Sequence, residues 1–131
     1  MTYLHHVRPR YDEIDMQQVV HNAHYLAYCD DACDLWLRSI WAEVGPVDWE
    51  VMVKKVTITW DGAARLHDDL AIAIAPVRWG TTSFDVGFDG TVDGDAIFSA
   101  VITYVAVRLA TMEAVPVPDS FRVAAGGPTA D

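Results

Sequence analysis

The amino-acid sequence predicts an α+β fold in which a mostly antiparallel sheet of five strands wraps around one long helix. One stretch, residues 22–44, repeats apolar residues at steps of three and four, as a helix with one buried face does. Five other segments have the alternating or continuous apolar pattern of strands. Short turns join the last four of these segments, which favours antiparallel pairing.

The whole chain, residues 1–131, is predicted to form a single domain. It is long enough to bury a core, its composition of 52% apolar and 21% charged residues is that of a globular protein, and no internal repeat or linker divides it. Pro116 and Pro118 indicate an ordered exit from the last strand. A flexible tail is expected from about residue 123.

The first strand is expected over residues 2–10, at a sheet edge, because Pro9 cannot donate a sheet hydrogen bond. The helix over residues 22–44 spans roughly 33 Å at 1.5 Å per residue. Gly45 and Pro46 end it. Its apolar stripe consists of Leu26, Cys29, Cys33, Trp36, Leu37, Ile40 and Val44. Both cysteines are expected to be reduced core residues, because a disulfide between them would need distorted geometry.

Four strands are expected after the helix, over residues 51–60, 70–79, 82–91 and 96–109. Asp93 and Gly94 are a two-residue hairpin signal before the last of them. Residues 61–69 are polar and turn-like, although residues 63–66 could continue an irregular strand. The last strand is apolar on both faces, and the chain has no element left to cover the second face. We therefore expect a homodimer or a larger assembly.

Charge and composition exclude several classes of partner. Nine basic against nineteen acidic residues give a formal net charge of −10, which argues against nucleic acid or an anionic membrane as the main partner. No apolar run approaches the roughly 20 residues of a membrane span. The N-terminus lacks the basic and apolar segments of an export signal, so a cytoplasmic protein is expected.

An acid-rich segment with Asp12, Glu13 and Asp15 precedes the helix. Such acids can simply stabilise the helix dipole, by a few tenths to about 1 kcal/mol, or be solvated loop residues. The functional interpretation is geometric, because Asp15 lies seven residues before the helix start and can fold back to face its free N–H groups. A carbonyl held between them would be polarised by the amides and attacked with help from the carboxylate.

Other catalytic chemistries lack a pattern in this sequence. His21 and His24, with three further histidines, have no established metal-ligand spacing, so neither a metal nor an organic cofactor is expected. No serine lies in a G-x-S-x-G elbow, and the glycine-containing segments match neither nucleotide fingerprint. Cys29 and Cys33 lie too far down the buried stripe to be good nucleophiles.

Three segments resemble a known family. Residues 10–15 read RYDEID and residues 19–26 read VVHNAHYL, which is similar to the start of hotdog-fold acyl-CoA thioesterases of the 4-hydroxybenzoyl-CoA thioesterase type. Residues 64–70, ARLHDDL, resemble the family's A-R-x-G-D-x-L segment. The resemblance covers nearly the whole chain and implies the hotdog fold, in which the sheet wraps around the helix.

By this resemblance Asp15 is the catalytic carboxylate, acting as nucleophile or as general base on water. The backbone N–H of Asn22 holds the thioester oxygen, and Tyr25 packs beside the acyl pocket. Family members are dimers or dimers of dimers with active sites between subunits. The other residues expected to contact the acyl-CoA substrate are Gln18, His21, His24, Arg65, Arg78 and Thr82.

The sequence departs from the family pattern at two places. The family's glycine before VV is Gln18 here, which predicts a different loop path and an extra polar group in the pocket. Where some relatives carry a basic run for the CoA phosphates, residues 78–83 hold only the charge of Arg78. Arg65 and Arg78 are by analogy the best phosphate contacts. The next candidates for phosphate contacts are Lys54, Lys55 and Arg122.

The resemblance therefore predicts an acyl-CoA thioesterase. An alternative is a non-catalytic acyl-thioester or small-ligand binding protein of the same fold, favoured by Gln18 and the missing basic run. A third possibility is a hydratase or dehydratase in which His21 and His24 act as acid and base. The sequence leaves three points open. They are the identity of the acyl group, whether the substrate is carried by CoA or by an acyl carrier protein, and whether the protein is a dimer or a tetramer.

Overall fold

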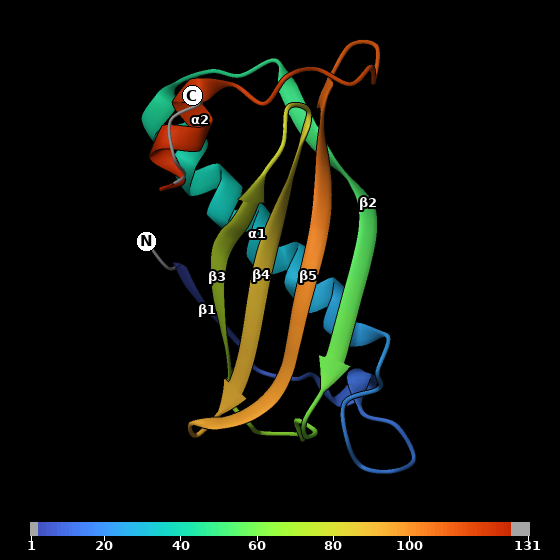
Figure 1. The fold of residues 1–131 in the computed structure, drawn as a ribbon. Coiled ribbons are helices and arrows are strands. Elements are labelled where there is room, and N and C mark those ends of the chain that lie inside the picture. Colours follow the sequence, from blue (N-terminus) through green and yellow to red (C-terminus); the bar gives the residue numbers. More distant parts are fainter. Residues whose placement is uncertain (1–2, 127–131) are drawn as a thin grey trace.

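A computed structural model describes residues 3–126 and shows a five-stranded antiparallel sheet that curves around the long helix α1 (Figure 1). The strand order is β1-β3-β4-β5-β2, so β1 and β2 are the two edges. The elements are β1 (Tyr3–Val7), a 3₁₀ helix (Tyr11–Glu13), α1 (His24–Val44), β2 (Trp49–Trp60), β3 (Leu70–Trp79), β4 (Ser83–Val92), β5 (Asp95–Arg108) and α2 (Asp119–Ala124). The predicted α+β class, with five strands around one long helix, is confirmed.

The helix α1 forms over 21 residues that contain neither glycine nor proline. Its buried side chains recur at three- and four-residue steps, as predicted. They are Tyr25, Tyr28, Cys29, Ala32, Cys33, Trp36, Leu37, Ile40 and Trp41. At Gly45 the backbone takes a φ of 95°, which glycine adopts without a steric cost, and the Gly45 N–H donates to the Trp41 carbonyl. The helix therefore ends where the sequence predicts.

Alternate residues of the central strands β3 and β4 fill the core against α1. The inward residues are Leu70, Ile72, Ile74, Phe84, Val86 and Phe88, all buried. Asp93 and Gly94 have φ values of 51° and 84° and join β4 to β5 in the tight hairpin that the sequence predicts. β1 is an edge strand, as expected, and ends at Val7 before Pro9.

Different elements of the fold lie at the two ends of the sheet. At one end β2 finishes at Trp60 beside Phe98 of β5, and β3 begins at Leu70 beside Val92 of β4. The first turn of α1 lies at this end (Figure 1). The turn between β3 and β4, the end of α1 and the helix α2 lie at the opposite end (Figure 1).

The structure differs from the sequence-based expectation near the C-terminus. The sequence does not predict α2, because a six-residue helix carries too little periodicity to be recognised. Phe121 anchors α2 in the core, with its ring centroid 5.0 Å from that of Trp49. α2 includes Val123 and Ala124, where the flexible tail is expected to begin. Residues 127–131 of that expected tail lie outside the described residues.

The segment of residues 63–66 is a loop and does not continue a strand. The outer face of β5 carries Val101, Thr103 and Val105, and Val101 is 41% exposed. An apolar outer face is thus present on the single chain. Its burial in an assembly stays a prediction.

Neither helix within residues 3–126 combines the length and the apolarity that crossing a membrane requires.

Candidate active site

A tight loop between the 3₁₀ helix and α1 presents Asp15. Ile14 and Val20 pair in an isolated antiparallel bridge. Inside this bridge the Asp15 N–H donates to the Val19 carbonyl and the Gln18 N–H donates to the Asp15 carbonyl, each at 2.9 Å. Because these bonds fix the loop backbone, the Asp15 carboxylate has a defined position.

Glu13 ties this loop to α1. Its carbonyl accepts the His21 N–H at 2.9 Å. Its carboxylate accepts the Arg10 N–H at 2.7 Å and the Tyr28 hydroxyl at 2.9 Å. Burial, and then the hydrogen bond to Glu13, raise the pKa of Tyr28 above its ordinary value, so the phenol stays protonated and keeps donating. The loop and the helix start therefore form one connected unit.

Asp15 and the start of α1 border a cavity of about 490 Å³ at the end of the sheet where β2 finishes. The cavity is lined by Asp15, Met16, Gln17, Val19, Val20, His21, Asn22, Tyr25, Trp60, Gly62 and Ala63. One wall is the loop and the helix start, and the other is the segment that follows β2. Both of the predicted catalytic groups, the Asp15 carboxylate and the Asn22 amide, belong to residues that line this cavity.

The Asp15 carboxylate is held by a backbone amide and has a histidine near it. Its Oδ1 accepts the Gln17 N–H at 2.8 Å, and its Oδ2 lies 3.8 Å from the His21 Nδ1. The Asp15 side chain is 26% exposed, so it is reachable by water and by a ligand in the cavity. An oriented carboxylate with access to water can serve as a general base or as a nucleophile.

The start of α1, which borders the same cavity as this carboxylate, leaves backbone amides free. Within residues 3–126, the N–H groups of Asn22 and Ala23 donate to no backbone carbonyl. The first turn closes after them, because the His24 N–H donates to the His21 carbonyl at 3.0 Å. Free amides at the positive end of a helix dipole stabilise negative charge on an oxygen. The arrangement can therefore polarise a carbonyl held in the cavity that Asp15 and Asn22 line.

Tyr25 fixes the opposite wall of the cavity. Its ring is buried, and its hydroxyl oxygen accepts the Ala64 N–H at 3.0 Å. The Ala64 carbonyl accepts the Val20 N–H at 2.9 Å, so the loop after β2 is bonded to both α1 and the Asp15 loop. Burial raises the pKa of Tyr25, which keeps the hydroxyl neutral. The Tyr25 ring also lies 6.0 Å from that of Trp60 between centroids.

The structure brings Asp15, His21, Asn22 and Tyr25 together around the cavity. The other residues predicted for this end of the molecule, Gln18, His24 and Arg65, are not among those that line it. Gln18 is exposed and takes a φ of 64°, His24 lies with its ring 5.9 Å from that of His21, and Arg65 is exposed just beyond the wall.

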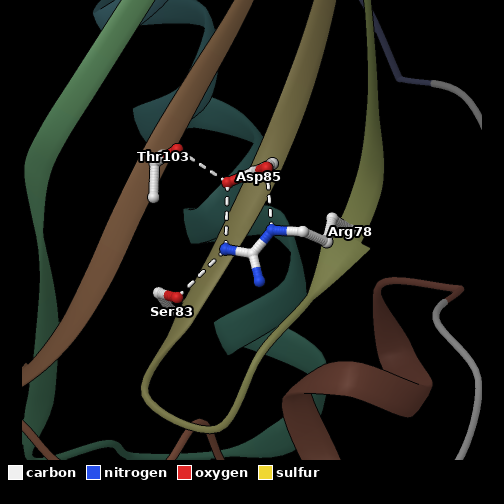
Figure 2. A network of polar contacts seen from close by, with 4 residues as sticks. All are labelled: Arg78, Ser83, Asp85 and Thr103. Carbon is white, nitrogen blue, oxygen red and sulfur yellow. Dashed lines mark hydrogen bonds and ion pairs between the residues drawn. The ribbon is translucent and has the colours of Figure 1, made fainter.

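Arg78 and Thr82 lie at the opposite end of the sheet, so a single chain does not bring them to the cavity. Figure 2 shows the Arg78 guanidinium facing Asp85, with Nε 2.8 Å from one carboxylate oxygen and Nη2 3.2 Å from the other. Nη2 also donates to Ser83. The expected phosphate contact at Arg78 is thus already bonded to a carboxylate on the outer face of the sheet.

The sequence does not predict the part that several residues play at the site. Trp60 and Gly62 lie at and just after the end of β2, where Trp60 pairs with Phe98 of β5. This strand register brings both residues to the cavity at the start of α1. Glu13 ties the loop to α1 because its carboxylate accepts a hydrogen bond from the hydroxyl of Tyr28, fifteen residues away. The signals for Glu13 in the sequence are the acid-rich segment before α1 and its place in the RYDEID motif.

Within residues 3–126, no group of three or more His, Cys, Asp or Glu side chains is placed to hold a metal ion.

Comparison with known proteins supports the same family. The chain matches the family model of the thioesterase-like superfamily over residues 8–125. No match to a curated protein was found. Among solved structures, a 1,4-dihydroxy-2-naphthoyl-CoA thioesterase from Synechocystis is 18% identical, with 96% of each chain covered and a TM-score of 0.80.

Two further structures share the fold. A gentisyl-coenzyme A thioesterase is 20% identical, with 93% of this chain and 98% of that chain covered and a TM-score of 0.82. A thioesterase superfamily protein from Jannaschia sp. CCS1 is 21% identical, with 95% and 91% covered and a TM-score of 0.85. The family match spans most of the chain, so the chain belongs to the thioesterase-like superfamily and is, by family, a thioester hydrolase with the hotdog fold.

Proposed function

We propose that this thioester hydrolase acts on an acyl-CoA and releases the free acid and CoA. The observation that carries the proposal is that the residues bearing the Asp15 carboxylate and the free Asn22 amide line one cavity. The names of two proteins with the same fold, a 1,4-dihydroxy-2-naphthoyl-CoA thioesterase and a gentisyl-coenzyme A thioesterase, support a CoA thioester as the substrate.

In the proposed reaction the thioester carbonyl oxygen accepts a hydrogen bond from the Asn22 N–H. The amide and the helix dipole stabilise the negative charge that develops on this oxygen. Asp15 takes a proton from water while the water oxygen bonds to the carbonyl carbon. When the tetrahedral intermediate collapses, the carbon–sulfur bond breaks and the CoA thiolate takes that proton from Asp15.

The same geometry supports a second route, in which the Asp15 carboxylate itself attacks the carbonyl carbon and expels the CoA thiolate. This route forms a mixed anhydride with Asp15, which water then hydrolyses. Rapid quenching followed by mass spectrometry of the protein separates the two routes, because only the nucleophilic route adds the mass of the acyl group to Asp15.

Supporting roles are assigned to the residues around these two groups. The His21 ring, 3.8 Å from the Asp15 carboxylate, orients it, and Tyr25 forms the buried side of the acyl pocket. The further substrate contacts proposed at the rim are Gln18, His24 and Arg65. Arg78 and Thr82 join the site only if a second subunit supplies them, and we propose a homodimer or a dimer of dimers.

Asp15→Asn tests the catalytic assignment, because it removes the proton acceptor and nucleophile while keeping the shape of the side chain. We expect kcat to fall by about 10²- to 10⁴-fold with little change in KM. Thiol release from short, long and aromatic acyl-CoAs measures both constants. Asp48→Asn is the matched control, because Asp48 is exposed at the opposite end of the sheet and pairs only with Arg108 among the described residues.

Unchanged thiol release by a folded Asp15→Asn variant would contradict the proposal. Tight binding of acyl-CoA by the wild-type protein without any thiol release would instead favour the non-catalytic binding protein. Calorimetry with the same panel of acyl-CoAs measures that binding.

A further inference from the structure

An open hollow of about 600 Å³ lies on the N-terminal side of the Asp15 loop and has no role in the reaction described above. It is lined by Arg8, Pro9, Arg10, Tyr11 and Asp12. The 3₁₀ helix that starts at Tyr11 ends at Glu13, two residues before Asp15. Along the chain, the lining of the hollow therefore ends at Asp12 and that of the cavity begins at Asp15, with Glu13 between them.

The backbone at the hollow presents two arginines on the same side. Pro9 is buried, and Arg8 and Arg10 on either side of it are exposed. Arg10 has an extended backbone, with φ −88° and ψ 156°, and the proline ring fixes the φ of Pro9. Because side chains alternate along an extended chain, burial of Pro9 turns both neighbours toward solvent.

Glu13 fixes the position of the hollow relative to the cavity. The Arg10 N–H donates to the Glu13 carboxylate at 2.7 Å, and the His21 N–H donates to the Glu13 carbonyl at 2.9 Å. The Tyr28 hydroxyl of α1 donates to the same carboxylate. The backbone at Arg10 is thus held at a set position from Asp15 and from the start of α1.

Four of the other seven basic residues of this acidic chain already have bonding partners, whereas Lys54, Lys55 and Arg65 form no ion pair among the described residues. Arg38 pairs with Asp34 and Glu50, Arg78 with Asp85 and Arg108 with Asp48. Buried Arg122 donates to the backbone carbonyls of Val117, Gly80 and Thr81.

The guanidinium groups of Arg8 and Arg10 at the hollow are more available than those of these four paired arginines. Arg8 forms no ion pair with any residue in the described part of the chain. Arg10 lies 3.4 Å from Asp12, but both side chains are more than 70% exposed, and pairs of that kind contribute little. Both guanidinium groups can therefore bind an anion in the hollow.

We propose that this hollow binds the phosphate-bearing nucleotide end of CoA, an inference that rests on the proposed function. Guanidinium groups match phosphate oxygens with paired hydrogen bonds. Tyr11, 85% exposed beside the two arginines, offers a flat aromatic face on which the adenine base stacks. The pantetheine arm separates the phosphates from the thioester, so it runs past the 3₁₀ helix from the hollow to the cavity.

Calorimetry with free CoA and with pantetheine, which lacks the nucleotide, tests the site without requiring turnover. The double variant Arg8→Ala/Arg10→Ala is expected to bind CoA at least about tenfold more weakly than the wild-type protein and to bind pantetheine equally well. The single variant Tyr11→Ala is also expected to weaken the binding of CoA and to leave the binding of pantetheine unchanged. Arg108→Ala is the matched control, because it removes one positive charge at the opposite end of the sheet.

Kinetics with an acyl-CoA and the matching acyl-pantetheine give the second readout. The double variant is expected to raise KM for the acyl-CoA, leave kcat unchanged and leave acyl-pantetheine hydrolysis unchanged. Wild-type affinity for CoA in the double variant, or an equal loss for CoA and pantetheine, would overturn the proposal. Absence of thiol release by the wild-type protein would refute the proposed function, while the CoA titrations would still decide whether the hollow binds the nucleotide.

Discussion

Gln18 holds the loop that presents Asp15 in a backbone conformation that suits glycine. Its φ of 64° lies in the left-handed region, which costs a residue with a Cβ about 1–2 kcal/mol. The hydrogen bond from its N–H to the Asp15 carbonyl keeps it there. This conformation explains why a glycine suits the position in the family that the sequence resembles. The Gln18 side chain is not part of the cavity lining.

Replacing Gln18→Gly is expected to raise the free energy of unfolding by about 0.5–1 kcal/mol, because relief of the left-handed strain exceeds the added entropy of the unfolded chain. Urea denaturation measures the change. Gln17→Gly is the neighbouring control, since Gln17 is not among the residues with positive φ, and it is expected to lower stability by about 0.5–1 kcal/mol. Equal destabilisation by both variants would show that Gln18 is not strained.

The resemblance predicted the residues of the site unevenly. Asp15, Asn22, His21 and Tyr25 come together because they lie within a short loop and the first turn of a helix, where spacing in the sequence fixes spacing in the structure. Trp60 lies thirty-five residues further along the chain than Tyr25, and strand register brings it to the cavity. No local pattern in the sequence encodes that register.

At the scale of elements, α1 and α2 show what local sequence can and cannot specify. α1 is predictable because its apolar stripe repeats over many turns and a glycine ends it. α2 has a single buried anchor, Phe121, whose partners Trp36, Trp49 and Phe84 come from α1, β2 and β4. A helix that depends on partners so distant in the chain has no signal within its own residues.

The ion pair of Arg78 and Asp85 joins three neighbouring strands. Arg78 lies on β3, Asp85 on β4, and Thr103 of β5 donates to the same carboxylate at 2.7 Å (Figure 2). The hydrogen bond from Arg78 holds the pKa of Asp85 below its ordinary value, and Thr103 contributes in the same direction. A lowered carboxyl pKa stabilises the folded state above the pKa of the carboxyl in the unfolded chain, which is about 3.9.

Arg78→Ala is expected to lower the free energy of unfolding by up to about 1 kcal/mol at pH 7, because the pair is partly exposed and screened. The difference from the wild-type protein should shrink as the pH falls through the folded-state pKa of Asp85, where the carboxylate becomes protonated. Urea denaturation at a series of pH values measures it. A difference that persists unchanged after protonation would mean that Arg78 acts through packing and not through charge.

The whole molecule leaves apolar side chains on its outer surface. Val101 of β5, Val77 of β3, and Met52 and Val53 of β2 are all exposed. The outer edge of β2 pairs with no strand among the described residues. An open edge beside exposed apolar side chains favours association with a second copy.

We expect sedimentation equilibrium at micromolar concentration to give a mass of at least twice that of the chain. The physical reason is the apolar surface that association removes from water. A single-chain mass under conditions in which the protein hydrolyses acyl-CoA at its full rate would contradict the proposed homodimer. It would also exclude a role for Arg78 and Thr82 at the cavity.

The sequence predicted the elements in order along the chain better than their arrangement in space. Alternating apolar residues, with turn residues between the segments, identify the strands. A short loop favours pairing of strands that are neighbours along the chain, such as β4 and β5. The placement of β2 at the far edge, beside β5, follows from how the sheet closes around α1. That placement builds one wall of the cavity, so the site could not be assembled fully before the fold was seen.

Cys29 and Cys33, the two cysteines of the chain, are both buried, and burial raises the pKa of each thiol to about 12. The native protein therefore presents almost no thiolate to an alkylating or disulfide-exchanging reagent. A chromogenic thiol reagent added to a reaction mixture consequently counts liberated CoA with negligible background from the enzyme. With substrate left out, the same reagent becomes a probe of stability, because each cysteine turns reactive only when α1 separates from the sheet.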